Sequence, residues 1–245
     1  MNKIAIIIPS RLDAQRLPKK PLKLINNKEM ILHVYEAALR SKAGEVYIAS
    51  PDKEIIDLIQ NVKGKVIKTS KEHETGTDRI YEVFKNALHS EPDIIINLQG
   101  DMPNINPKAI FDLVSYMKKN KCDIGTLASD LTSNSELENP NVVKVSVKSK
   151  LHEDIFLNAI DFFRTGQSSK NNLYHHIGIY AFTNKALVRY VSLKRSNLEL
   201  ERNLEQLRAL ENNMSIHVGY IKSSPLSIDT EEDLIEIKKI MENKK

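Results

Sequence analysis

The segment after the first apolar run of the chain has residues suited to binding phosphate. Residues 11–20 contain four cations and one anion, and they follow the β-branched run Ile4–Ile8 and Pro9-Ser10. Pro18 and Pro21 stiffen this segment, because each proline fixes its own φ and restricts the residue before it. Arg and Lys on a stiff loop suit a polyphosphate, although a solvated basic loop has the same composition. No G-x-G-x-x-G or Walker A pattern follows, which excludes those two nucleotide fingerprints.

Two acids stand where a metal could be held. Gln99-Gly100-Asp101 follows the apolar run Asp93–Leu98, and Asp229 precedes Thr230–Asp233. Mg²⁺ prefers one or two carboxylates together with phosphate oxygens, so it is one possible partner for either acid. Helix capping is the alternative for both, and for each acid taken by itself it is the stronger interpretation. Thr230–Asp233 approximates a capping box with Asp in place of Glu or Gln.

Two further segments have mixed readings. Glu74–Arg79 opens a helical pattern that Thr77 or Asp78 would cap. Free N–H groups there, with Arg79, would also suit an anion or a base edge. His175-His176 lies in an expected strand, where adjacent residues point to opposite faces, so we expect no metal site formed by two histidines.

These residues lie at the ends of elements in a repeating strand-then-helix pattern. Short β-branched runs alternate with apolar stripes spaced i, i+3, i+4, i+7. The expected strands are Ile4–Ile8, Val46–Ala49, Lys65–Lys68 and Asp93–Leu98, and the expected helices contain Ile31–Ala38, Ile55–Val62, Ile80–Ala87 and Ile110–Met117. Four such units predict an α/β fold with a three-layer, mostly parallel, Rossmann-like sheet and right-handed crossovers. Ligands of such sheets bind outside the carboxyl ends of the strands.

The second half of the sequence is less regular. We expect strands at Val142–Val147, Ile177–Phe182 and Ile216–Ile221, a Glu/Leu-rich helix over Leu198–Leu210, and a final helix from about Thr230. The polar stretch Ser129–Asn141 is the expected loop between two halves. We predict one continuous domain, 1–245, made of the halves 1–128 and 129–245.

The composition describes an ordinary globular protein and excludes several classes. The 245 residues are 41% hydrophobic and 28% charged, which excludes a disordered or low-complexity polymer. A net charge of +4 is weak support for nucleic-acid binding. The single Cys122 excludes a disulfide framework and a thiolate zinc cluster, and it fits a reducing compartment. No long apolar run exists, and the first one stops at Pro9. We therefore expect no spanning helix, no secretory signal and a cytoplasmic location.

Seven segments together resemble one family, in the same order and at similar spacing from residue 4 to about residue 235. They resemble the CMP-Kdo synthetases (3-deoxy-manno-octulosonate cytidylyltransferases). The segments are Ile8–Arg11 with Arg16–Pro18 and Lys20–Leu22; His73 with Gly76–Arg79; Asn97–Asp101 with Pro103; Asn139–Asn141 with Val143-Lys144; His176–Tyr180; Leu204–Arg208; and Asp229-Thr230 with Asp233-Leu234. Each segment is weak alone, but seven in register are specific.

The resemblance implies a reaction, a cofactor and partners. The anomeric C2 hydroxyl of Kdo would attack the α-phosphate of CTP, giving CMP-Kdo and pyrophosphate for lipopolysaccharide assembly, with Mg²⁺ as cofactor. It also implies the fold of the nucleotide-diphospho-sugar transferases and a homodimer. Residues 1–128 would then be the nucleotide-binding half, and 129–245 the sugar-binding and dimerisation half. CTP and Kdo are the expected partners; nucleic acid and membrane are not.

The resemblance also implies roles for single residues. Asp101 and Asp229 would hold the metal, while Arg11 and Lys20 would stabilise the departing pyrophosphate, because this chemistry depends on positioning and electrostatics. These four are the expected catalytic residues. The expected nucleotide-binding residues are Ser10, Arg11, Arg16, Lys20, His73, Gly76, Thr77, Arg79 and Gln99. The expected sugar-binding residues are Gln99, His176, Tyr180, Glu205 and Gln206.

Five positions depart from the family pattern and leave alternatives open. Lys19 stands where the family usually has Gly, Pro51 and Met102 where acids are common, Asn158 where Arg is usual, and Arg202 where Glu is common. The same reaction on an 8-amino variant of Kdo, or on another nonulosonate such as sialic acid, is therefore an alternative. A non-catalytic nucleotide or RNA binder is an alternative of another class. It would need no metal-binding acids, and its affinity would fall steeply with salt.

Overall fold

The computed structural model describes residues 3–14, 16–153, 155–165 and 172–242. The chain forms two compact units. Unit 1 consists of Met1–Asp112 and Pro225–Lys245, and unit 2 consists of Leu113–Ser224. The last segment of the chain therefore belongs to the unit in which the chain begins.

Unit 1 contains the expected parallel sheet. Its strands are β1 (Ile4–Pro9), β4 (Glu45–Ser50), β5 (Val66–Lys68) and β6 (Ile94–Leu98), in the order β5-β4-β1-β6, and every neighbouring pair is parallel. Because β4 and β6 flank β1 on opposite sides, the strand order reverses between β1 and β6. Ligands of open α/β sheets bind at such a switch point.

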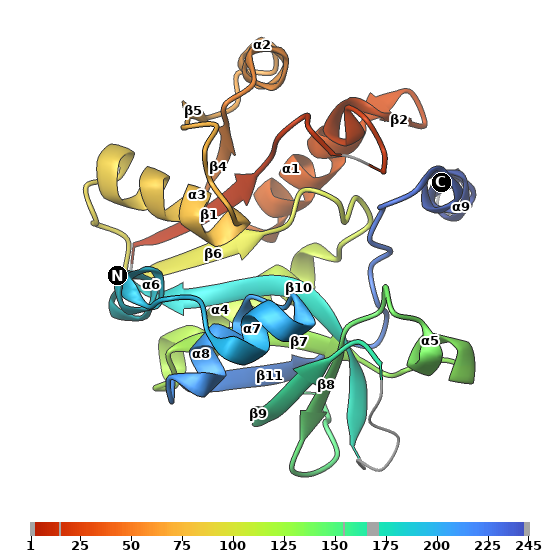
Figure 1. The fold of residues 1–245 in the computed structure, drawn as a ribbon. Coiled ribbons are helices and arrows are strands. Elements are labelled where there is room, and N and C mark those ends of the chain that lie inside the picture. The colour runs from red at the N-terminus through yellow and green to blue at the C-terminus, as the bar shows by residue number, and fades with distance from the viewer. Residues whose placement is uncertain (1–2, 15, 154, 166–171, 243–245) are drawn as a thin grey trace. The chain divides into compact units, whose positions relative to one another are not determined.

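The helices of unit 1 follow the predicted apolar stripes. They are α1 (Met30–Ser41), α2 (Lys53–Asn61), α3 (Gly76–Glu82) and α9 (Glu231–Glu242), and a π-helical turn, η2 (Val83–Ala87), continues α3. A 3-10 turn, η1 (Lys20–Leu22), and a two-stranded hairpin, β2 (Leu24–Ile25) with β3 (Lys28–Glu29), lie between β1 and α1. Figure 1 shows α3 crossing β1 and β6. The β-branched runs of β1 and β6 are buried, as the absence of alternation predicts.

Unit 2 has a mixed sheet. Its strands are β7 (Ile124–Ser129), β8 (Lys144–Val147), β9 (Phe156–Phe163), β10 (Leu173–Thr183) and β11 (Ile216–Tyr220). Only β7 and β11 pair in parallel among the described strands of this unit, whereas β10–β7, β11–β9, β8–β9 and β10–β8 are antiparallel. Its helices are α5 (Asn134–Glu138), α6 (Asn184–Ser192), α7 (Asn197–Arg202) and α8 (Gln206–Glu211), and α4 (Pro107–Lys119) spans the boundary between the units.

Several expectations for the second half are wrong. The helix expected over Leu198–Leu210 is two helices, because Asn203 has a φ of 53° and ends α7 in the left-handed region. The loop expected over Ser129–Asn141 starts inside β7 and contains α5. We predicted neither β7, β9 nor α6. β9 contains Asn158 and Asp161, which interrupt its apolar pattern.

The division into units follows the strand pairing and differs from the expected halves, 1–128 and 129–245. β7 belongs to unit 2 because it pairs with β10 and β11. The C-terminal segment belongs to unit 1, where Leu234 and Ile237 of α9 pack in one apolar cluster with Ile25 and Met30. Among the described residues, no helix has the length and apolar character needed to cross a bilayer. The cytoplasmic location stays a prediction.

Candidate active site

A cavity of about 260 Å³ lies at the switch point of unit 1. It is lined by the segments that follow β1 and β6 and by the loop before α3. Eight of the expected site residues line it: Ser10, Arg11, Lys20, His73, Gly76, Arg79, Gln99 and Asp101. The remaining lining residues are Pro9, Ala14, Pro21, Glu74, Thr75 and Gly100. The structure therefore brings most of the expected nucleotide-binding residues to one place.

The loop after β1 is fixed by its backbone. The Asp52 carboxylate accepts a hydrogen bond from the Leu12 N–H at 2.8 Å, and the Lys19 N–H donates to the Leu12 carbonyl at 3.2 Å. Lys19 has a φ of 54°, in the region where glycine is favoured, so the glycine usual at this position of the family has a conformational reason. Buried Ser10 lines the cavity, and its hydroxyl has no hydrogen-bond partner among the described residues. Such a hydroxyl is available to a ligand.

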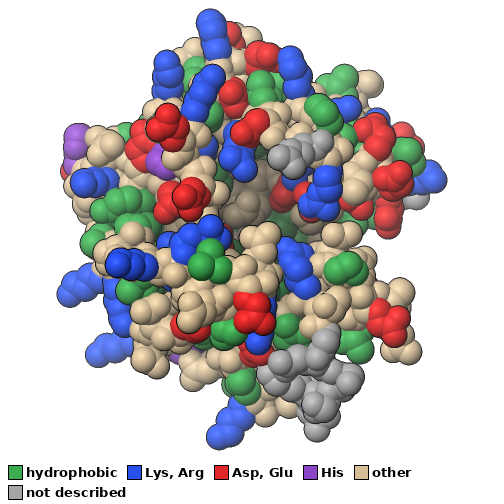
Figure 2. Space-filling view, in the orientation of Figure 1, with side chains coloured by type: hydrophobic (Ala, Val, Ile, Leu, Met, Phe, Trp, Pro, Cys, Tyr) green, Lys and Arg blue, Asp and Glu red, His purple; other side chains and the backbone are tan. Residues whose placement is uncertain are grey.

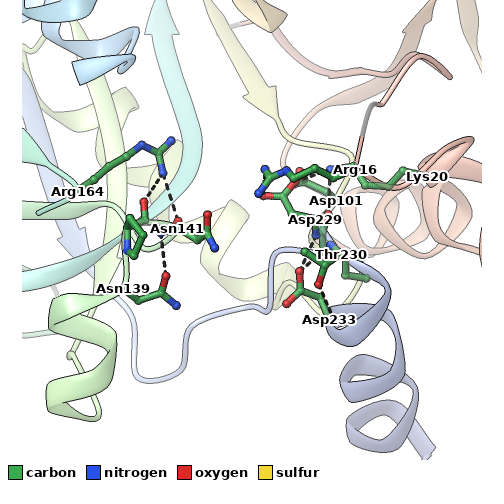
Figure 3. Close-up of polar contacts among 11 residues, drawn as sticks. Arg16, Lys20, Asp101, Asn139, Asn141, Arg164, Asp229, Thr230 and Asp233 are labelled. Carbon is green, nitrogen blue, oxygen red and sulfur yellow. Dashed lines mark hydrogen bonds and ion pairs between the residues drawn. The ribbon is translucent and has the colours of Figure 1, made fainter. Parts of the chain in front are cut away.

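Lys20 joins the two expected metal-binding acids. Its ammonium donates to Asp101 Oδ2 at 2.9 Å, to Asp229 Oδ1 at 3.1 Å and to the Ile228 carbonyl at 2.9 Å. Figure 3 shows Lys20, Asp101 and Asp229 converging in this way. Burial alone would lower the pKa of Lys20, but the attraction of both carboxylates outweighs it and the pKa is raised. Lys20 is therefore a permanent cation at the edge of the cavity.

Neither acid caps a helix with its side chain. The helix after Asp101 begins at Pro107, and the Asn106 side chain accepts from the Lys108 N–H at its start. At α9, Thr230 and Asp233 form a reciprocal capping box. The capping alternative is therefore wrong for both Asp101 and Asp229, whose carboxylates face Lys20 instead.

The other cations of the loop also have acidic partners. Arg16 Nη2 contacts Asp229 Oδ2 at 3.0 Å, and Arg11 Nε contacts Asp13 Oδ1 at 3.1 Å. Both arginine side chains are more than half exposed, so these pairs contribute little stability. Their guanidinium groups can exchange a carboxylate for a phosphate at small cost.

Arg79 is a buried cation in the wall of the cavity. Its Nη1 donates to Thr69 Oγ1 at 2.6 Å and to the Ser70 carbonyl at 2.7 Å. Burial lowers the pKa of Arg79, and the nearby charge of Arg11 lowers it further. An anion in the cavity would relieve both effects.

The start of α3 differs from the expected one. Thr75 is the N-cap, and Thr75 and Asp78 form a reciprocal capping box. The expectation that Thr77 or Asp78 is the N-cap is therefore wrong, although the Thr-x-x-Asp spacing was visible in the sequence. Thr77 is buried, and its hydroxyl accepts from Asn97 Nδ2 at 3.2 Å. Thr77 is thus absent from the described lining of the cavity, and its nucleotide-binding role stays a prediction.

Both glycines at the cavity lie close to side chains of neighbouring segments. A Cβ on Gly76 would lie 3.3 Å from Pro9 Cγ, and a Cβ on Gly100 would lie 3.2 Å from Ile31 Cδ1. Gln99 extends between them, and its Nε2 lies 3.5 Å from Asn97 Oδ1. A Cβ at either position would require a small shift of the neighbouring Pro9 or Ile31 side chain.

Four expected sugar-binding residues lie in unit 2. His176 and Tyr180 of β10 have ring centroids 5.5 Å apart. His176 Nε2 lies 2.9 Å from Thr126 Oγ1, and burial lowers the pKa of His176 to about 3. Burial raises the pKa of Tyr180, and the charge of Glu205 raises it further. Gln206, the first residue of α8, is buried. The structure gathers Tyr180 with His176 and Glu205, and their role toward a sugar stays a prediction.

The two adjacent histidines diverge, as expected. His175 Nδ1 lies 3.7 Å from Glu136 Oε1 and 3.4 Å from Ser224 Oγ, whereas His176 packs edge-on against Phe162.

Among the described residues no group of three or more His, Cys, Asp or Glu side chains could hold a metal. Asp101 and Asp229 are a set of two carboxylates on one ammonium. That set fits Mg²⁺, which takes one or two carboxylates and completes its shell with phosphate oxygens and water.

The departures from the family pattern have local partners. Arg202 Nη1 donates to Asp161 Oδ1 at 2.8 Å and to the Phe162 carbonyl at 3.0 Å. Asn158 is exposed on β9, opposite His217 of β11. Met102 is buried at 3% exposure. Because this residue is a methionine, no second carboxylate follows Asp101.

The Asn139–Asn141 motif is held by two cations. Lys144 is fully buried, and its ammonium donates to the Asn139 carbonyl at 2.7 Å and to the Arg164 carbonyl at 2.6 Å. Arg164 Nη1 in turn donates to the Pro140 carbonyl at 3.0 Å (Figure 3). Burial lowers the pKa of Lys144. This motif therefore fixes a loop of unit 2.

Comparison with known proteins gives the same family as the motifs. The cytidylyltransferase family matches residues 5–216. The 3-deoxy-manno-octulosonate cytidylyltransferase of Bartonella bacilliformis is 39% identical over 238 residues, covering 96% of this chain and 97% of that protein. Its counterpart in Brucella ovis is 42% identical over 234 residues, covering 95% and 93%. A solved structure of CMP:2-keto-3-deoxy-manno-octonic acid synthetase complexed with CTP has a TM-score of 0.89 and 34% identity, covering 99% of this chain and 100% of that one.

These matches show that this chain is a cytidylyltransferase, which is an α/β nucleotidyltransferase. Within that class, the chain belongs to the 3-deoxy-manno-octulosonate cytidylyltransferase family.

Proposed function

We propose that the protein transfers CMP from CTP to the anomeric hydroxyl of Kdo, releasing pyrophosphate, and that CMP-Kdo then serves lipopolysaccharide assembly. The convergence of Asp101 and Asp229 on Lys20 at the edge of the cavity is the observation that carries this proposal. A structure of a similar protein was solved with CTP, which supports CTP as the nucleotide. The names of the curated relatives support Kdo as the acceptor.

The charges of the cavity suit a triphosphate. Three cations, Arg11, Lys20 and Arg79, line it together with two acids, Glu74 and Asp101. The Lys20 ammonium would stabilise the negative charge that develops on the leaving pyrophosphate. The Arg11 guanidinium can exchange the Asp13 carboxylate for a phosphate oxygen. A largely buried and fixed donor such as Lys20 can stabilise charge that develops in the transition state. The Ser10 hydroxyl adds a donor that no described protein group uses.

Mg²⁺ held by Asp101 and Asp229 would supply charge neutralisation on the triphosphate and polarise the attacking hydroxyl. The chain's own contribution is to keep both carboxylates together. Lys20 does this in the free protein, because its ammonium contacts both. Asp233 accepts from the Asp229 N–H at 2.9 Å, which fixes the backbone that presents the second carboxylate.

A pyrophosphate-release assay tests the proposal. The purified protein is supplied with CTP or UTP, with and without Mg²⁺, and with a panel of Kdo, 8-amino-Kdo and sialic acid. We expect release with CTP, Kdo and Mg²⁺ together. Release only with another acid would correct the acceptor, and binding of CTP without release on any sugar would favour the non-catalytic binder.

The surface of unit 1 gives little support to RNA binding. Figure 2 shows Lys and Arg side chains mixed with Asp and Glu at the top of the view, where Figure 1 places α2. Two such pairs are Lys53 with Asp57 and Lys19 with Glu54. A surface of mixed sign attracts a polyanion less than a basic stripe does.

We also propose a homodimer. Unit 2 exposes apolar side chains at Ile155, Ile160 and Leu200, at 45%, 55% and 56% exposure. Exposed apolar groups become buried where they lie in a protein interface. Sedimentation velocity tests this, and we expect a species of twice the mass of the chain; a species of the mass of one chain at all concentrations contradicts it.

A further inference from the structure

Glu82 holds a residue of the cavity wall without lining the cavity itself. The segment from Thr69 to Thr75 connects β5 to α3 and contributes His73, Glu74 and Thr75 to the wall. The Glu82 carboxylate, at the last residue of α3, accepts from His73 Nε2 and from the Ser70 N–H at 3.0 Å. The His73 and Glu82 side chains are 17% and 26% exposed, so water competes only partly for these contacts.

Arg79, one turn before Glu82, holds the same connection from within. Its guanidinium donates to Thr69 Oγ1 and to the Ser70 carbonyl. The backbone of Ser70 is therefore hydrogen-bonded through its carbonyl to Arg79 and through its N–H to Glu82. Two side chains of one helix thus fix the segment that carries His73 to the cavity.

The contact with Glu82 decides which ring nitrogen of neutral His73 carries the proton. The pKa of Glu82 would be raised by its burial, but the hydrogen bonds from His73 and Ser70 lower it overall, so the carboxylate is ionised and can only accept. Nε2 must then carry the hydrogen, and Nδ1 is left as an acceptor. Nδ1 has no hydrogen-bond partner within the described part of the chain.

We propose that Glu82 is a positioning residue for the nucleotide site: it holds His73 in the Nε2–H tautomer, so that Nδ1 accepts a hydrogen bond from a donor of the nucleoside. The exocyclic amine of the base and a ribose hydroxyl share this donor chemistry. The inference rests on the proposed function, because it takes the cavity of unit 1 as the site of CTP.

The loss of the Glu82 charge and the loss of its positioning role should change the affinity for CTP in opposite directions. Glu82 is a nearby anion for Arg79 in a cavity that we assign to a triphosphate. Loss of its charge alone would strengthen CTP binding. Loss of positioning would release His73 and Ser70 and weaken CTP binding. The direction of the change therefore separates the two effects.

The experiment compares Glu82→Ala with the matched control Glu72→Ala by calorimetric titration with CTP. Glu72 is exposed in the same connection, and its carboxylate has no ion pair among the described residues. We expect the Kd of CTP to rise about tenfold in Glu82→Ala, which corresponds to about 1.4 kcal/mol, and to stay unchanged in the control. Glu82→Gln keeps one carbonyl acceptor and should recover most of the affinity. Equal or tighter binding by Glu82→Ala overturns the proposal.

Two readouts distinguish positioning from general loss of structure. Glu82→Ala added to His73→Ala should weaken CTP binding no further than His73→Ala alone, because residues that act through one contact are not additive. The ¹⁵N resonances of His73 should show the Nε2–H tautomer in the wild type and in Glu82→Gln, and a mixture of tautomers in Glu82→Ala. Additive losses, or the same tautomer in every variant, contradict the inference.

Nucleotide analogues identify the donor. If the donor is the base amine, Glu82→Ala should discriminate less between CTP and UTP than the wild type does. If the donor is a ribose hydroxyl, the analogue that lacks this hydroxyl, 2′-deoxy-CTP or 3′-deoxy-CTP, should bind equally to wild type and variant, because the contact is already absent. No effect of the variant on any analogue contradicts the inference. A wild type that binds no CTP at all defeats the proposed function itself, which keeps the two failures distinguishable.

Discussion

Replacing Lys20 by Met separates the electrostatic role of this residue from its packing. Methionine keeps an unbranched side chain but removes the ammonium that contacts Asp101 at 2.9 Å and Asp229 at 3.1 Å. The side chains of Lys20, Asp101 and Asp229 are 17%, 22% and 39% exposed. Breaking a fully buried pair costs about 3–5 kcal/mol and an exposed pair about 0–1 kcal/mol. We therefore expect Lys20→Met to lose about 1–3 kcal/mol of stability without metal.

The same change should strengthen metal binding while it weakens turnover. Two carboxylates without their ammonium attract a divalent cation more strongly, so Mg²⁺ should restore part of the lost stability. Turnover should still fall about 10²–10³-fold, as expected when one fixed donor to developing charge is removed. A fall in kcat, and not only a rise in KM for CTP, is expected because the contact strengthens in the transition state.

Thermal unfolding in EDTA and at rising Mg²⁺, with pyrophosphate release in parallel, provides the assay. Each kcal/mol corresponds to about 2–4 °C in Tm for a chain of this size. Lys19→Met is the matched control, because the Lys19 side chain is exposed and its ammonium pairs with Glu54, outside the acidic pair. Near-wild-type turnover of Lys20→Met, or a Tm that responds to Mg²⁺ no more than that of the wild type, would refute the reasoning.

Three further predictions test single residues. Asp101→Asn should lower kcat by about 10²-fold or more and leave the Tm within a few degrees; retained turnover in the pyrophosphate assay would remove Asp101 from the metal role. Because burial lowers the pKa of His176 to about 3 from 6.5, the unfolded state binds a proton that the folded state does not, and stability falls as the pH falls across this interval. Urea unfolding at pH 7 and pH 4.5 should show the His176→Gln variant less pH-dependent, by about 1.4 kcal/mol per pH unit. Gly219→Ala would place a Cβ 2.3 Å from Phe156 Cζ, so we expect about 1–3 kcal/mol of destabilisation, and an unchanged urea midpoint would contradict this packing.

The parallel half of the fold was readable from local pattern. Ile4–Ile8 and Ile94–Ile96 are continuous apolar runs rich in β-branched residues. A strand that is buried on both faces needs such a run, because polar side chains on either face would have to be buried. Unit 2 was read less well, because its strands mix polar residues with apolar ones. β9 keeps Asp161 buried through an ion pair with Arg202, and no rule of spacing along the chain reveals that pair.

The site shows the same limit. Local reasoning favoured capping for Asp229, and only the resemblance placed it with Asp101, because 209 residues separate Asp229 from the lysine that it shares with Asp101. Asp52 and Glu82 were missed altogether. Asp52 acts through the Leu12 N–H, 40 residues away, and Glu82 acts through His73, 9 residues away. Neither acid has a sequence signature of its own. The N-cap at Thr75 is different, since its spacing from Asp78 was visible.

The return of the C-terminal segment to unit 1 has a consequence for synthesis on the ribosome. A nascent chain released to Ser224 holds all of unit 2 and the strands of the parallel sheet, yet it lacks Asp229 and the apolar anchors Leu234 and Ile237. Its Lys20 faces one carboxylate in place of two. The acidic pair is therefore assembled only after Asp229 has been translated, and a product that ends at Ser224 lacks both the second carboxylate and two of the side chains that pack against Ile25 and Met30.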